Sequence, residues 1–212
     1  MDTTNNNASL EALQDIRSIM DRSARFVSLS GMSGIWAGGV ALVGSYIAYQ
    51  LLQRPDYQYI GKPLNGTPEF FDKFTINLVL LGLGVFVVAL VGAFYFTYKK
   101  ARKNSHTLWN NASRQLLIQG FFPLLAGGVF SVAFIYYGCG MFVVPVCLVF
   151  YGLALISGSR HTLSDIRYMG MLEVVLGCSA LFFPGFGLYF WAIGFGILHI
   201  FYGAMMWNKY DK

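Results

Sequence analysis

Two ionisable residues, Glu173 and His199, lie inside apolar stretches of the sequence, and their side chains are the best candidates for chemistry. Each lies 13 residues from Phe186, at the centre of the turn between the two stretches. In an antiparallel helical hairpin both side chains would lie at a similar depth, within about a turn or two of its open end. A carboxylate beside an imidazole can hold a proton near physiological pH, so the pair is a candidate proton-sensitive site. In the alternative interpretation, Glu173 reaches the surface or Arg167, and His199 bonds a backbone carbonyl as a packing residue.

A second polar group lies in the loop of residues 158–168, with Arg160, His161, Asp165 and Arg167 as its candidate site residues. His161 and Asp165 invite comparison with the HxxxxD motif of acyltransferases, but their spacing is one residue short. We therefore interpret this segment as a solvated loop that caps the following helix.

The densest basic cluster consists of Lys99, Lys100, Arg102 and Lys103, directly after an apolar stretch. Beside anionic lipid headgroups each of these residues would contribute on the order of 1 kcal/mol. The alternative is that the cluster only sets the orientation of the chain in a membrane.

The sequence predicts no catalytic activity. It contains no nucleophile, phosphate-binding or metalloprotease motif. The three cysteines have no CxxC pattern, so we expect neither a metal nor a cofactor. The net charge of +5 comes from basic residues that flank apolar runs, so it indicates membrane orientation and not a nucleic-acid partner.

The elements that must position these residues are membrane-spanning helices. Hydrophobic residues make up 56% of the 212 residues and charged residues only 12%. A hydrocarbon core about 30 Å thick requires roughly 20 apolar residues per helix. We expect an all-α, polytopic membrane protein with six spans, at about residues 26–52, 74–98, 115–137, 141–157, 169–183 and 187–207.

Residues 1–25 precede the first span and predict a cytoplasmic tail that continues into an amphipathic helix from Ser9. The remainder, residues 26–212, forms the membrane domain. Twelve of the 15 Lys and Arg residues lie on one predicted side, and Arg54, Lys62 and Lys73 on the other. The positive-inside rule then places both termini in the cytoplasm, and we expect the bacterial cytoplasmic (inner) membrane.

Similar segments recur along the chain and predict three helical hairpins of common design. Residues 37–40 (AGGV) recur as residues 126–129, and residues 150–152 (FYG) recur as 201–203. In the last hairpin, Gly170 and Gly177 are spaced by seven, as are Gly196 and Gly203, which predicts a seam between its two helices. The glycines expected at helix contacts are Gly34, Gly38, Gly127, Gly128, Gly170, Gly177, Gly194, Gly196 and Gly203.

Gly34 and Gly38 form a GxxxG step, which serves either packing within the chain or dimerisation, and we favour packing within the chain.

The glycine-rich half-spans, the turn at Pro184-Gly185 and the closing run from Trp191 to Gly203 resemble membrane proteins of the HdeD type. The likeness covers roughly residues 120–207. It implies six spans made from repeated hairpins and an association with acid-stress tolerance, without an established activity. Separately, residues 20–31 (MDRSARFVSLSG) resemble the opening of membrane proteins of Bacteroidota that have no known chemistry.

These features together predict a non-enzymatic integral membrane protein, an envelope, stress-response or partner-binding component. Its expected partners are the lipid bilayer and either a second copy of the chain or a membrane or cytoplasmic protein. The alternative is a small proton-coupled transporter or channel that uses Glu173 and His199.

Overall fold

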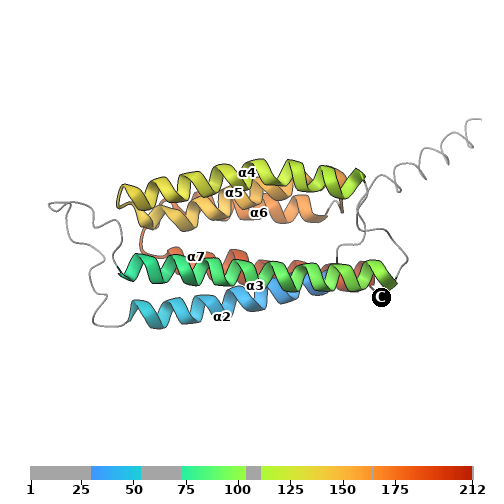
Figure 1. Cartoon of the computed structure of the whole chain (residues 1–212), viewed down its shortest axis with the longest axis horizontal. Coiled ribbons are helices and arrows are strands. Elements are labelled where there is room, and N and C mark those ends of the chain that lie inside the picture. Colours follow the sequence, from blue (N-terminus) through green and yellow to red (C-terminus); the bar gives the residue numbers. More distant parts are fainter. Residues whose placement is uncertain (1–29, 54–72, 104–110, 164, 212) are drawn as a thin grey trace, which may run out of the picture.

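The computed structural model describes residues 30–53, 73–103, 111–163 and 165–211 (Figure 1). In these ranges the chain forms helices and turns, and no strand. The predicted tail and amphipathic helix of residues 1–25 lie outside the described residues, and so does most of the loop after the first span.

The helices match the predicted spans closely, with shifted ends. The main helices are α2 (Gly31–Leu52), α3 (Lys73–Lys103), α4 (Asn111–Tyr136), α5 (Val143–Gly158), α6 (Asp165–Ala180), α7 (Gly187–Trp191) and α8 (His199–Met206). Short 3-10 turns occupy Gly140–Phe142 and Ser159–His161, and π-helical segments occupy Ala192–Leu198 and Trp207–Asp211. Because α7, α8 and both π-helical segments follow one another without a break, we call residues 187–211 the last helix.

Five helical stretches in the described part of the chain are long and apolar enough to cross a membrane. They are Gly31–Leu52, Phe74–Lys103, Asn111–Tyr136, Gly140–Gly158 and Gly187–Lys209. The remaining helix, α6, has 16 residues, which at 1.5 Å per residue gives a length of about 24 Å, a little short of a full crossing. An all-helical chain with this many long apolar helices is compatible with a multi-pass membrane protein.

The helices form two layers (Figure 1). In one layer α5 packs between α4 and α6, and in the other α2 packs between α3 and the last helix. The last helix contacts α6 far less than it contacts α2. The prediction that residues 169–207 pack as a hairpin with a seam of its own was therefore wrong, because each of its helices has a more extensive contact elsewhere.

Glycines explain this pairing, since they let two helix backbones approach closely. A Cβ atom on Gly170 of α6 would lie 2.7 Å from the carbonyl oxygen of Gly152 in α5. A Cβ atom on Gly203 of the last helix would lie 2.5 Å from the backbone nitrogen of Ile35 in α2. The glycine seams thus join α6 to α5, and the last helix to α2.

The GxxxG step of α2 lies in the second of these seams. A Cβ atom on Gly34 would lie 3.0 Å from the Cα atom of Gly203, and one on Gly38 would lie 2.6 Å from the carbonyl oxygen of Gly196. Both glycines therefore pack within the chain.

The prediction that Gly128 lies at a helix contact was wrong. A Cβ atom on Gly127 would lie 2.6 Å from the Cβ atom of Phe150, at the contact between α4 and α5. A Cβ atom on Gly128 would meet nothing within 4 Å. Consecutive helical residues point about 100° apart, so the two glycines face different directions and only Gly127 lies at a helix contact.

Candidate polar site between the helix layers

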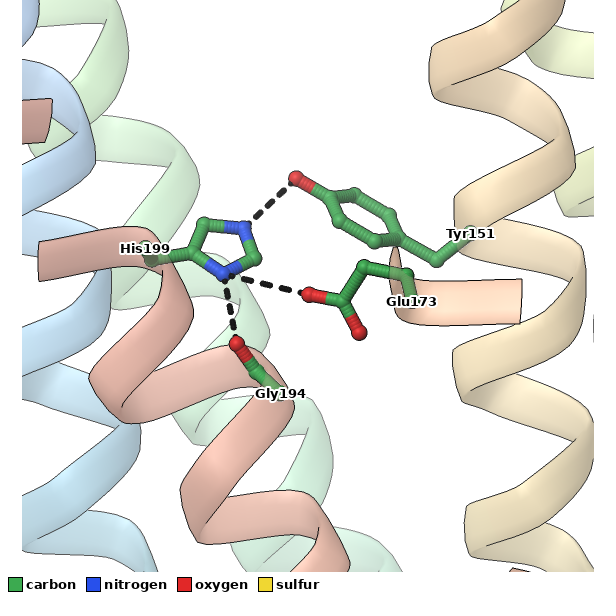
Figure 2. A network of polar contacts seen from close by, with 4 residues as sticks. All are labelled: Tyr151, Glu173, Gly194 and His199. Carbon is green, nitrogen blue, oxygen red and sulfur yellow. Dashed lines mark hydrogen bonds and ion pairs between the residues drawn. The ribbon is translucent and has the colours of Figure 1, made fainter. Parts of the chain in front are cut away.

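Glu173 and His199 meet between the two layers, and a third side chain, Tyr151, joins them (Figure 2). Glu173 comes from the middle of α6, Tyr151 from α5, and His199 from the last helix. The Nδ1 atom of His199 lies 3.6 Å from Oε1 of Glu173. The other ring nitrogen, Nε2, lies 2.8 Å from the hydroxyl oxygen of Tyr151. The site therefore links both layers through side chains far apart in the sequence.

The site is enclosed. Glu173 has an exposed fraction of 0%, and His199 is 7% exposed. Arg167 is exposed on the surface, so Glu173 reaches neither the surface nor that residue. Among the described residues, neither oxygen of the buried Glu173 carboxyl group has a hydrogen-bond partner. This arrangement costs free energy, and it costs more when the group is charged than when it is neutral.

His199 also bonds the backbone, as the packing interpretation predicts. Its Nδ1 atom lies 3.0 Å from the carbonyl oxygen of Gly194, five residues earlier in the same helix. Gly194 belongs to the π-helical segment Ala192–Leu198. Isolated π-helical turns inside α-helices occur frequently at functional sites. Here the segment places a carbonyl group directly beside the imidazole ring.

Gly194 also makes room for the carboxyl group. A Cβ atom at this position would lie 2.7 Å from Oε2 of Glu173 and 2.5 Å from Cδ2 of Leu148. Sequence spacing predicted a packing glycine here, and the structure shows that its neighbours include the polar site itself.

Aromatic rings surround the imidazole of His199. The Tyr151 ring stacks on it with centroids 5.3 Å apart, and Phe195 lies against both rings. Sequence reasoning missed Tyr151, which is one of 13 tyrosines in the chain. Its span and that of His199 are not consecutive, so only the fold brings the two residues together.

The predicted loop site does not form a cluster among the side chains that the structure describes. Asp165, at the start of α6, accepts a hydrogen bond from Nζ of Lys209, with 3.0 Å between Nζ and Oδ2. Arg160 and Arg167 are exposed, and the His161 side chain lies outside the described residues. This end of α6 is therefore attached to the end of the last helix by an ion pair.

The basic cluster borders a shallow surface hollow of about 370 Å³, which is lined by Tyr95, Tyr98, Lys99, Arg102 and Lys103. Lys100, the remaining basic residue of the cluster, does not line this hollow. A second hollow, of about 500 Å³, is lined by residues of α4 and α5 together with Arg160. Neither hollow reaches Glu173 or His199. Within the described ranges, no group of three or more His, Cys, Asp or Glu residues could hold a metal ion.

In the part of the chain that the structure describes, the protein is all-helical, is compatible with a multi-pass membrane protein, and contains the buried polar cluster of Tyr151, Glu173 and His199. Comparison with models of protein families, with curated proteins and with solved structures finds no match.

Proposed function

We propose that this chain is a non-enzymatic integral membrane protein that acts as an envelope, stress-response or partner-binding component. The helices present large apolar side chains outward, as in α3, where Leu83, Val91 and Phe94 are more than half exposed. Such a surface suits contact with lipid or with another membrane protein, including a second copy of the chain. The HdeD-type resemblance supports the stress-response part of the proposal.

The observation that carries this proposal is the enclosed packing around the buried cluster of Tyr151, Glu173 and His199. A conducting protein needs a polar path that water or a substrate can enter. Glu173 has no exposed surface, and both hollows described above lie away from it. The packing therefore favours a role through surface contacts over conduction.

A flux assay tests this proposal. The full chain is reconstituted into liposomes that contain a pH-sensitive dye, and a pH gradient or a membrane potential is applied. We expect proton flux equal to that of protein-free liposomes. Flux that depends on the protein would overturn the proposal.

A second candidate function, a small proton-coupled transporter or channel, is favoured by the unpartnered carboxyl group of Glu173 at the contact between two layers. An ionisable group inside a span marks a functional site by default. The same assay identifies this function if the reconstituted protein carries flux and Glu173→Gln abolishes it. Flux that Glu173→Gln leaves unchanged would exclude a transporter that works through this site.

We further propose that the chain lies in a bacterial cytoplasmic membrane with both termini in the cytoplasm. The two ends of the described chain lie at the same end of the bundle as the basic end of α3 (Figure 1), which the positive-inside rule assigns to the cytoplasm. Cys139, in the turn before α5 at the opposite end, provides the test in a variant that lacks Cys147 and Cys178. A membrane-impermeant maleimide added outside intact spheroplasts should label Cys139. Labelling only after lysis would indicate the opposite orientation.

A further inference from the structure

The two ring nitrogens of His199 have partners of different kinds, and this difference determines where the ring carries its protons. A backbone carbonyl only accepts hydrogen bonds. Because the carbonyl oxygen of Gly194 lies 3.0 Å from Nδ1, Nδ1 must carry a hydrogen and donate it. Oε1 of Glu173 lies farther from the same nitrogen, at 3.6 Å. Nδ1 is therefore protonated in both the neutral and the charged ring.

The exchangeable proton of the ring consequently belongs to Nε2. In the neutral ring Nε2 has a lone pair and accepts a hydrogen bond from the Tyr151 hydroxyl group, 2.8 Å away. In the charged ring Nε2 donates to the Tyr151 oxygen instead. A hydroxyl group serves as donor or acceptor by rotating, so Tyr151 supports both states.

Glu173 has no such adaptable partner. No described group forms a hydrogen bond with either oxygen, and Nδ1 of the His199 ring lies 3.6 Å from Oε1. The apolar side chains of Leu148 and Leu176 lie beside the same carboxyl group, around Gly194. A bare carboxylate next to a neutral ring would be a buried, uncompensated charge, and a charged ring next to a neutral carboxyl group would be another.

We propose that Glu173, His199 and Tyr151 form a binding site for a single proton, which is bound either to the Glu173 carboxyl group or to Nε2 of His199. The site is neutral as a whole in both states. When the proton changes place, an O–H bond at Glu173 breaks and an N–H bond at Nε2 forms, and no electrons are exchanged. Tyr151 is a positioning residue that keeps Nε2 paired throughout. This site goes beyond the proposed function, because it can exist in a protein that carries no flux.

Nitrogen NMR of the histidine ring tests the assignment of Nδ1. The chain has three histidines, so the double substitution His106→Gln and His161→Gln leaves only His199 to observe. In protein labelled with ¹⁵N-histidine and reconstituted into liposomes, we expect the neutral ring to carry its hydrogen on Nδ1. A neutral ring with its hydrogen on Nε2 would overturn the proposal.

Infrared spectroscopy of the same sample tests the count of one proton. The C=O stretch of a protonated carboxyl group should be present when the ring is neutral, and Glu173→Gln should remove it. Because both states hold one proton, a change of pH should leave the ratio of this band to the imidazolium signal in the NMR spectrum unchanged, whereas a change of temperature that lowers the band should raise the imidazolium signal to the same extent. A carboxylate beside a neutral ring, or a carboxyl group beside a charged ring, would refute the single-proton site.

Tyr151→Phe separates the positioning role from simple packing. Loss of the hydroxyl group removes the acceptor that the charged ring needs, and leaves the bond from Nδ1 to Gly194 in place. We expect the hydrogen to remain on Nδ1 and the imidazolium fraction to fall several-fold at the same pH. An unchanged imidazolium fraction would exclude Tyr151 from the site. Because the NMR and infrared measurements use the unaltered site, they decide the proposal even if Tyr151→Phe fails to fold.

Discussion

The last helix contacts its two neighbouring groups of helices in different ways. Toward α2 it presents Gly196 and Gly203, and the two backbones approach closely along an apolar glycine seam. Toward α5 and α6 it presents Gly194 and His199, and the contact is small and includes an unpartnered carboxyl group. The first face holds the helix in place, and the second brings titratable groups together. We infer that stability and the candidate function reside in two different contacts of one helix.

The largest effect should come from filling the glycine seam. In Gly38→Val, the new Cβ atom would clash with the carbonyl oxygen of Gly196, a backbone atom 2.6 Å away. Overpacking of a tight core costs about 1–3 kcal/mol, and a clash with backbone should reach or exceed the upper value. We expect a large fall in the temperature at which the detergent-solubilised protein loses its monodisperse form.

The adjacent residue provides a matched control. A Cβ atom on Gly39 would meet nothing within 4 Å, so Gly39→Val adds the same side chain to the same helix without a clash. It should leave the transition temperature nearly unchanged. Equal losses in the two variants would show that valine disturbs α2 itself and that the seam is not the cause.

A smaller loss is expected from Gly127→Val in α4. The nearest atoms there all belong to the side chain of Phe150. Its Cβ atom, 2.6 Å away, moves only with the backbone, but the ring beyond it can rotate away. We expect a cost of about 1–3 kcal/mol in the same assay. Gly128→Val, which points into open space, is the control. A larger loss for Gly127→Val than for Gly38→Val would contradict the ranking of the two contacts.

The same pairs of glycines show how much of the helix packing could be predicted from the sequence. The recurrent AGGV segments were recognisable, and in both of them the first glycine packs while the second faces open space. What the first glycine packs against was not predictable, because Gly38 meets the last helix and Gly127 meets the adjacent α5. Periodicity identifies which residues share a helix face, but it contains no information on which distant helix covers that face.

The candidate site was predictable to a similar extent. The rarity of ionisable residues in the apolar stretches pointed to Glu173 and His199, and the structure places them 3.6 Å apart. The two residues come together in a different way from the one predicted. Their helices barely pack as a hairpin, and the contact forms where the two layers meet. Tyr151 could not be found from the sequence, since its contact with His199 spans 48 residues.

On the polar face we expect substitutions to change stability in opposite directions. Glu173→Leu removes a buried carboxyl group whose oxygens have no hydrogen-bond partner among the described residues, and a buried polar group left without such a partner costs about 1–3 kcal/mol. Thermal stability in detergent should therefore stay the same or rise.

His199→Leu is the matched substitution on the other side of the site. It leaves the Gly194 carbonyl and the Tyr151 hydroxyl group without their ring partners, which should cost roughly 1–3 kcal/mol. A loss of stability in Glu173→Leu as large as that in His199→Leu would mean that the carboxyl group holds the layers together.

The smallest effect is expected where the polar face reaches the surface. Lys209 of the last helix bonds Asp165 of α6 at 3.0 Å, but the Lys209 side chain is 54% exposed. Exposed ion pairs contribute about 0.2–1 kcal/mol, because water and salt screen the attraction. Lys209→Met should therefore lower the transition temperature only slightly, Lys209→Arg should restore it, and high salt should make wild type and Lys209→Met nearly equal. If Lys209→Met instead destabilised the protein as much as Gly38→Val, the contact with α6 would hold the last helix as firmly as the glycine seam does.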